Sequence, residues 1–245
     1  MLGDCIDLFV TIDDNSIDLV ITDPPYGVDF KADYDDSPTH VFSIHEEWVN
    51  LIQTKLKPHS HAYFFIPTTE VEKWVIAVKK YLNLNNILAT QVYLNKTLAK
   101  NNFKFDLQLI LYASKGKAKN FNKVNWIKKS DVWLDDKRNP DKNPYTYFYP
   151  SFISNNIVRA NTKSNQQIKR LHPNQKSTKL IKDLIRISSN KGDIVLDPFC
   201  GSGSTCVSAA QLKRKFIGFE KQEKYWRIAC ERVKKYTQTK SLMKY

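Results

Sequence analysis

The most constraining feature of this 245-residue chain is a pair of short, largely apolar runs that each end in Asp-Pro. Residues 17–22 are followed by Asp23 and two prolines, and residues 194–196 by Asp197 and one proline. Runs of this kind are typical of strands buried on both faces of a parallel sheet. Both therefore predict strands of an α/β sheet, each delivering an aspartate to its carboxyl end.

Strands and helices alternate around these two runs. Further strands are expected over residues 61–66, 87–94, 105–113 and 215–219. Helices are expected over residues 5–12, 46–56, 70–82, 177–188, 205–212 and 222–236. This alternation predicts a Rossmann-like, doubly wound and mostly parallel sheet, which is an α/β fold.

The charge of the chain is unevenly distributed. Residues 1–95 hold 6 Lys and Arg against 14 Asp and Glu, whereas residues 96–180 hold 18 against 5. A general enrichment in lysine along the chain would not leave its first third acidic. A basic surface that only faces solvent is the simpler alternative. The basic middle is therefore expected to face a polyanion, with nucleic acid the leading candidate.

Regular alternation stops between residues 115 and 170, where the chain is rich in Lys, Asn, Pro and aromatic residues. This segment is predicted to be an insertion between two parts of one sheet. Trp126, Trp133 and the aromatic run at 145–149 either stack on nucleic acid or build a small core of the insertion.

The cysteines, the apolar segments and the histidines limit which class of protein this is and which kinds of site it can hold. The four cysteines lack metal-ligand spacing, which predicts a reduced, cytoplasmic protein without structural zinc. No apolar segment reaches the roughly 18 residues of a membrane span, so no membrane partner is expected. Four histidines also lack ligand spacing and are expected at the surface or in loops: His40, His45, His59 and His61.

The stretch DPFCGSGST at residues 197–205 predicts a ligand loop. Gly201 and Gly203 would let the backbone pass close to a ligand at the carboxyl edge of the sheet, although a plain tight turn also uses such glycines. The GK[ST] ending of a phosphate-binding P-loop is absent. Glu220 ends the next strand, where it would accept hydrogen bonds from ribose hydroxyls or serve as a helix-start carboxylate. Together these residues suit a nucleoside.

The stretch DPPY at residues 23–26 predicts a second site. Its prolines hold the backbone extended and rigid, so their carbonyls point outward. Asp23 and those carbonyls can accept hydrogen bonds from an exocyclic amine, and Tyr26 offers an aromatic face to the ring that carries it. A base swung out of a duplex has this chemistry. A rigid turn with a packed tyrosine is the alternative.

Together these stretches resemble the β-class S-adenosylmethionine-dependent DNA amino-methyltransferases, which have a circularly permuted methyltransferase fold. DPPY resembles their catalytic motif, DPFCGSGST their cofactor loop, and HPNQKS at residues 172–177 the motif that encloses the methionine end of the cofactor. The order of the motifs is that of the β-class. The resemblance implies a catalytic half at 1–114, a target-recognition insertion at 115–170 and a cofactor-binding half at 171–245.

The resemblance also implies roles for individual residues and names S-adenosyl-L-methionine as the cofactor, with no metal. The catalytic residues would be Asp23, Pro24, Pro25 and Tyr26. The cofactor-binding residues would be Asp4, Cys5, Asp23, Lys176, Ser177, Asp197, Phe199, Cys200, Gly201, Ser202, Gly203, Thr205 and Glu220. Asp4 would reach the adenine of the cofactor, and Lys176 and Ser177 would border its amino-acid end.

The implied reaction is site-specific methylation of the N6 amine of a flipped-out adenine in duplex DNA. Asp23 favours adenine, because the family usually pairs DPPY with N6-adenine and SPPY with N4-cytosine. An N4-cytosine enzyme, an RNA methyltransferase and a non-catalytic DNA-binding subunit stay open. A glutamine-directed protein methyltransferase is disfavoured by motif order and by Asp23, where that class has Asn. A homodimer and a cognate restriction endonuclease are further partners to test.

Three departures from the family pattern stand out, one of which is the short insertion at residues 115–170. Ser177 occupies a position where the family more often has proline, and the chain starts at MLGDC where the family normally has a preceding strand.

Overall fold

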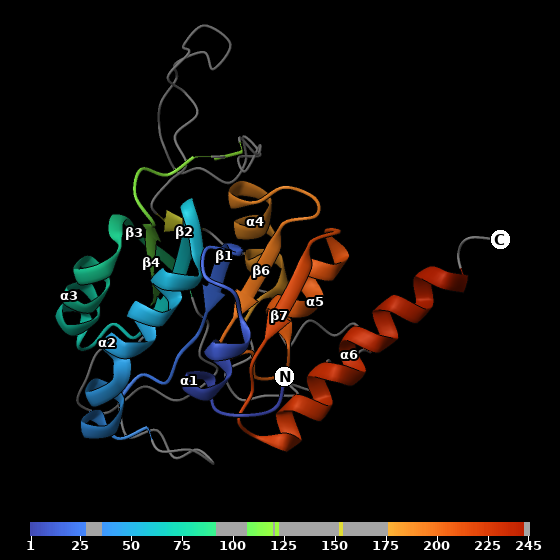
Figure 1. Cartoon of the computed structure of the whole chain (residues 1–245), viewed down its shortest axis with the longest axis horizontal. Coiled ribbons are helices and arrows are strands. Elements are labelled where there is room, and N and C mark those ends of the chain that lie inside the picture. Colours follow the sequence, from blue (N-terminus) through green and yellow to red (C-terminus); the bar gives the residue numbers. More distant parts are fainter. Residues whose placement is uncertain (28–35, 92–106, 120, 123–151, 154–175, 243–245) are drawn as a thin grey trace, which may run out of the picture.

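The structure is a computed structural model that describes residues 1–27, 36–91, 107–119, 121–122, 152–153 and 176–242. A mixed sheet with strand order β5-β3-β4-β2-β1-β6-β7 forms its centre (Figure 1). Its strands are β1 (Ile17–Thr22), β2 (Leu56–Ile66), β3 (Asn83–Gln91), β4 (Leu107–Ser114), β5 (Phe152–Ile153), β6 (Ile194–Asp197) and β7 (Lys215–Gly218). β4 runs antiparallel to both neighbours and the other pairs are parallel. The predicted, mostly parallel α/β sheet is confirmed.

Helices cover both faces of this sheet. They are α1 (Cys5–Leu8), the 3₁₀ helix η1 (Phe9–Thr11), α2 (Pro38–Lys55), α3 (Val71–Tyr81), α4 (Thr178–Ser188), α5 (Ser204–Gln211) and α6 (Glu223–Leu242). Because successive strand side chains point to opposite faces, Leu19 and Ile21 pack with α4 and α5, whereas Val20 packs with α2 and α3. Figure 1 shows α6 reaching away from the sheet at its far end.

The connections diverge at the neighbouring strands β1 and β6. The crossover from β1 to β2 uses α2 on one face, and the crossover from β6 to β7 uses α5 on the other. Leu19 lies opposite Val195 in the parallel register, so Asp23 and Asp197 leave the sheet at the same edge. This is the topological switch point at which doubly wound folds bind ligands.

The elements α2 and β2 begin five or more residues earlier than the sequence predicts. α2 starts at Pro38 instead of residue 46, because Ser37 caps the helix by accepting a hydrogen bond from the His40 N–H at 3.4 Å and proline suits the first helical turn. β2 starts at Leu56 instead of residue 61. An irregularity in the β1–β2 register lets the strand pass Pro58 and His59, and His59 has a φ of 71°.

Most of the predicted insertion lies outside the described residues, including Trp126, Trp133 and residues 145–149. One part of it, β5, pairs in parallel with β3, so that Phe152 lies opposite Ala89. The segment therefore contributes a strand to the sheet, which the sequence did not predict.

The prediction of surface or loop histidines is wrong for two of the four. His45 is buried, with its ring edge-on to Trp74 at 5.7 Å. His61 is buried in β2 and hydrogen-bonds the Tyr112 hydroxyl at 2.9 Å, and burial lowers the pKa of this imidazole. Both rings therefore belong to the core.

Within the described residues, no helix is long and apolar enough to cross a membrane. In the same part of the chain, no group of three His, Cys, Asp or Glu side chains is arranged to hold a metal ion.

Candidate functional site

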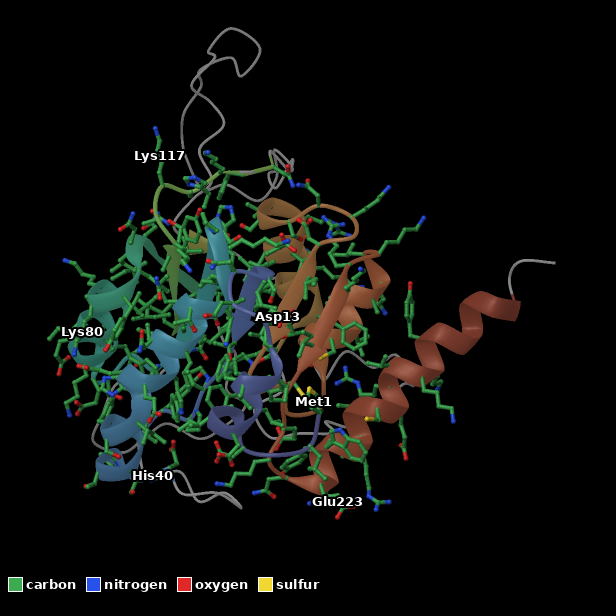
Figure 2. All side chains as sticks on the ribbon, in the orientation of Figure 1. Met1, Asp13, His40, Lys80, Lys117 and Glu223 are labelled. Atoms are coloured by element: carbon green, nitrogen blue, oxygen red, sulfur yellow. The ribbon has the colours of Figure 1, made fainter. Side chains whose placement is uncertain are left out.

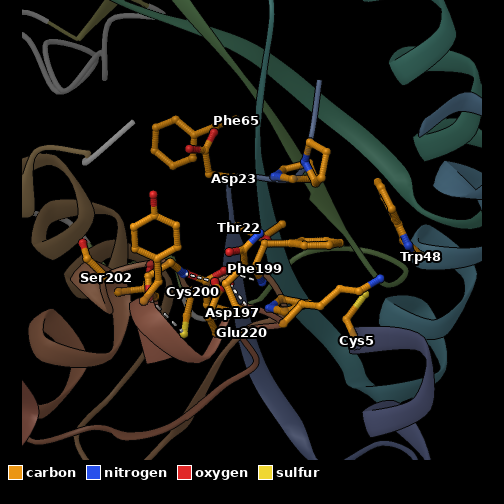
Figure 3. Close-up of a pocket in the computed structure, with 18 of the residues that line it drawn as sticks. Cys5, Thr22, Asp23, Trp48, Phe65, Asp197, Phe199, Cys200, Ser202 and Glu220 are labelled. Atoms are coloured by element: carbon orange, nitrogen blue, oxygen red, sulfur yellow. Dashed lines mark hydrogen bonds between the residues drawn. The ribbon is translucent and has the colours of Figure 1, made fainter. Parts of the chain in front are cut away.

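A cavity of about 790 Å³ opens at the carboxyl edge of β1 and β6 (Figure 3). In Figure 2, His40, which lines this cavity, lies at the end of the molecule opposite Lys117. Fourteen of the predicted site residues line it: Asp4, Cys5, Asp23, Pro24, Pro25, Tyr26, Lys176, Asp197, Phe199, Cys200, Gly201, Ser202, Thr205 and Glu220. The two separate motifs, far apart in sequence, thus form one chamber.

The other two predicted residues lie at helix starts. Ser177 caps α4, where its hydroxyl accepts a hydrogen bond from the Leu180 N–H at 3.5 Å. Gly203 precedes α5 with a φ of 79°, and a Cβ there would lie 2.8 Å from the Cβ of Ala229 on α6. Gly203 therefore allows α6 to approach the loop closely.

The loop between β6 and α5 is held from several sides. The Cys200 N–H donates to the Phe219 carbonyl at 2.8 Å, and the Gly201 N–H donates to the Glu220 carboxylate at 2.9 Å. From α6, Arg232 donates to the carbonyl of Ser202 at 2.5 Å and to its hydroxyl at 3.0 Å. These bonds fix the backbone of the loop before any ligand arrives.

Asp197 is buried at the start of this loop. Burial raises the pKa of its carboxyl to about 7, although the Thr205 hydroxyl and the Phe199 N–H act in the opposite direction. The Phe199 N–H donates to it at 3.2 Å. Asp197 thus organises the turn from inside.

Glu220 closes the other side of the chamber beside the first residues of the chain. Its carboxylate oxygens accept from the N–H groups of Gly201 and Gln222, the latter at 2.8 Å, and burial raises its pKa. Its backbone pairs with Met1 and Gly3, through Glu220 N–H to the Met1 carbonyl at 3.1 Å and Gly3 N–H to the Glu220 carbonyl at 2.9 Å. This pairing brings Asp4 to the same wall.

Asp4 makes two contacts of its own at that wall. One carboxylate oxygen accepts from the Ile6 N–H at 3.0 Å and so caps α1, and the other pairs with Lys221 at 2.9 Å. The side chain therefore borders the cavity with its charge already paired.

The DPPY loop forms the opposite wall, where Figure 3 shows Asp23 near Phe65. The Tyr26 hydroxyl donates to one oxygen of Asp23 at 2.5 Å, and Lys176 lies 3.0 Å from the other. Asp36 accepts from the backbone N–H groups of Tyr26 at 2.7 Å and Gly27 at 2.9 Å. The backbone and the carboxylate of this loop are therefore both held in place.

The sequence reading missed one wall of the cavity, which α2 supplies. His40, Ile44 and Trp48 line the chamber at intervals of four residues, so they share one helical face. The Trp48 ring meets Phe199 edge-on at 4.8 Å between centroids. The Ser37-Pro38 start signal followed by this spacing could have identified the wall.

The chamber has two chemically distinct ends. One end offers glycine backbone, the acidic Glu220 and the Trp48–Phe199 aromatic wall, which suit a ribose with an attached base. The other offers the Asp23 carboxylate beside the Tyr26 ring, which suits a planar ring carrying an amine. A group held at the first end could therefore react with an amine at the second.

Known proteins resemble this chain in sequence and in fold. The model of the N6/N4 methyltransferase family, described as DNA methylase, matches residues 17–231. The type II methyltransferase M.HpaI of Haemophilus parainfluenzae is 30% identical over 242 residues, which cover 91% of this chain and 69% of the relative. The type II methyltransferase M.BamHI of Bacillus amyloliquefaciens is 27% identical over 98% of this chain. The match covers only 58% of M.BamHI.

Solved structures share the fold. PvuII DNA methyltransferase, described as cytosine-N4-specific, has a TM-score of 0.70 at 19% identity and covers 94% of this chain and 84% of its own. The complex of M1.HpyAVI with SAM has a TM-score of 0.62 at 22% identity. The match covers 95% of this chain and 97% of the M1.HpyAVI chain.

Proposed function

We propose, from the premise that this chain belongs to the N6/N4 DNA methylase family, that this DNA methyltransferase modifies the N6 amine of a flipped-out adenine in duplex DNA. The observation that carries the proposal is the Asp23 carboxylate, which lies with Tyr26 in the same chamber as the Glu220 end. The carboxylate that would accept a hydrogen bond from the amine and the nucleoside site therefore open into one cavity.

The residues present fit S-adenosyl-L-methionine as the methyl donor. Glu220, already fixed by two backbone N–H groups, has lone pairs left for ribose hydroxyls. Trp48 and Phe199 provide an apolar wall for the base. When bound, the cofactor supplies a methyl group made electrophilic by its sulfonium.

The chain's own residues prepare the amine. An exocyclic amine is a weak nucleophile, because its lone pair is delocalised into the ring. Asp23 and the Pro24 carbonyl accept its two N–H bonds out of the ring plane, so the nitrogen becomes tetrahedral and the lone pair localises on it. Tyr26 holds the ring by stacking. Alignment and fixed acceptors are thus the main contribution of the protein, and Cys200 and Cys206 are not needed as nucleophiles.

The choice of adenine rests on Asp23. The fold does not discriminate, since an enzyme described as cytosine-N4-specific shares it. N4-cytosine is therefore the alternative product, reached by the same mechanism.

Three wider features belong to the proposal. Residues 115–170 act as the target-recognition region, because their excess of Lys and Arg suits phosphates. The relatives named as type II methyltransferases suggest a cognate restriction endonuclease, and a homodimer is the expected assembly. The four cysteines are free thiols, as in a reducing compartment such as the cytoplasm.

The test is to incubate the protein with unmethylated genomic DNA and labelled S-adenosylmethionine, digest the DNA to nucleosides and identify the product by mass spectrometry. N6-methyladenine is the expected product. N4-methylcytosine would overturn the role given to Asp23. Labelling of RNA in a parallel reaction, with none in DNA, would overturn the substrate.

A further inference from the structure

Lys176 contacts the catalytic loop with a full set of partners. Its ammonium lies 3.0 Å from Asp23 Oδ2, 3.0 Å from Tyr26 Oη and 3.1 Å from Gln108 Oε1. An ammonium group has three N–H donors, so these three acceptors match it. The side chains of Lys176 and Asp23 are only 19% and 20% exposed, and an ammonium with so little water needs such partners.

Gln108, on β4, is turned so that it can serve Lys176. Its amide nitrogen donates to the Ile66 carbonyl at 2.5 Å. A carbonyl can only accept, so the NH₂ group of Gln108 must face Ile66 and its oxygen must face Lys176. The backbone of β2 therefore sets the orientation of a side chain that belongs to none of the sequence motifs.

The hydroxyl of Tyr26 completes the arrangement. It has one proton, and the 2.5 Å contact assigns that proton to Asp23 Oδ1, which leaves the hydroxyl oxygen as an acceptor for Lys176. The ammonium lies 3.0 Å from that oxygen but 5.4 Å from the ring centroid. The ammonium thus lies beyond the hydroxyl end of the Tyr26 ring. It stays clear of the ring face on which a base would stack.

We propose that Lys176 is a positioning residue for Asp23 and Tyr26, and that Gln108 in turn positions Lys176. This inference rests on the proposed function. It differs from the role implied by the family resemblance, in which Lys176 borders the amino-acid end of the cofactor, because the ammonium of Lys176 donates to Tyr26 and Gln108 and forms an ion pair with Asp23. Lys176 and Gln108 then hold the carboxylate in one orientation while the target amine binds.

The test compares Lys176→Met, Gln108→Met and the double variant with the wild type, after the methylated site has been mapped. Two quantities are measured: the cofactor dissociation constant by calorimetry, and kcat at saturating cofactor and DNA. Lys176→Met should lower kcat about 100-fold and Gln108→Met about tenfold, with cofactor affinity within about threefold of the wild type. The double variant should be no slower than Lys176→Met, because Gln108 acts through Lys176.

Lys57→Met is the matched control, since Lys57 also pairs with an aspartate, Asp18 at 2.6 Å, but lies outside the lining of this cavity. Its kcat should be unchanged, and thermal unfolding of all variants checks that they fold. A loss of cofactor affinity of about tenfold in Lys176→Met, with kcat retained at saturation, would overturn the proposal. The proposal would also be overturned if the effects of Lys176→Met and Gln108→Met on kcat multiplied in the double variant. An Asp23→Ala variant that stays active would instead overturn the proposed function.

Discussion

In the proposed reaction, Asp23 accepts a hydrogen bond from an amine although both of its oxygens already have partners, Tyr26 and Lys176. A carboxylate has about four lone-pair sites, so a further donor can still bind. Asp23→Ala should reduce methylation by about 100-fold or more, because the acceptor that localises the amine lone pair is lost. Labelled methyl transfer to DNA measures this. Cofactor affinity should change little, and Asp13→Ala, in the exposed loop before β1, should stay active. Retained turnover in Asp23→Ala would contradict the assignment.

Asp197 predicts a pH dependence of stability. Burial raises its pKa from 3.8 to about 7, so between those values the native state holds a proton that the unfolded state has released. The contribution of Asp197 to stability is therefore fully present below about pH 4 and falls as pH rises through about 7. Asp197→Asn removes this titration.

Urea unfolding of wild type and Asp197→Asn at about pH 5 and about pH 8 measures the effect. The wild type should lose free energy of unfolding relative to the variant as pH rises. Asp13→Asn serves as the exposed control. If the difference in free energy of unfolding between wild type and Asp197→Asn stayed constant across this pH range, a raised pKa at Asp197 would be ruled out.

At the scale of elements, the contact between α6 and the start of α5 depends on Gly203. A Cβ there would meet Ala229 at 2.8 Å, whereas one at Gly116, with a similar φ of 70°, would meet nothing within 4 Å. Gly116→Ala therefore measures the cost of the backbone conformation alone. Gly203→Ala should cost about 1–3 kcal/mol more in free energy of unfolding, because α6 must move.

Chemical denaturation of both variants tests this difference. Adding Ala229→Gly to Gly203→Ala should recover part of the loss, even though glycine in a helix costs about 1 kcal/mol by itself. Equal losses in Gly203→Ala and Gly116→Ala would show that α6 does not pack tightly against the loop.

At the scale of the whole molecule, the net charge of +13 and its concentration after residue 95 predict salt-sensitive binding to DNA. Lysines and arginines that contact phosphates release counterions. Raising NaCl from about 50 to about 200 mM should weaken binding to non-specific duplex at least tenfold, and about 10³-fold if six phosphates are contacted. Fluorescence anisotropy measures this, with S-adenosylhomocysteine binding as a control that should change little. Salt-independent DNA binding would contradict the role given to the basic segment.

The sequence was sufficient to predict most strands of the sheet and the position of the DPPY and glycine-rich loops at its carboxyl edge, because continuous apolar runs, prolines and glycines act locally. Prediction failed where distant partners decide the structure. The predicted strand began at residue 61, yet β2 starts at Leu56 and carries Pro58 in an irregular stretch beside β1. Gln108 reads as an ordinary strand residue, because its partners, Ile66 and Lys176, lie 42 and 68 residues away. The cavity wall on α2 was missed because the Ser37-Pro38 helix start was not used.

The pairing of β1 with β6 has a consequence for synthesis of the chain. Val195, which lies opposite Leu19, leaves the ribosome about 9 to 35 seconds after it, at about 5–20 residues per second. During that interval the edge of β1 that later receives β6 is unpaired, and such an open edge invites aggregation. A chain released early would therefore carry its DPPY loop without the glycine-rich loop. Methylation should begin only with nearly full-length protein, and truncated chains should need chaperones and leave DNA unmarked.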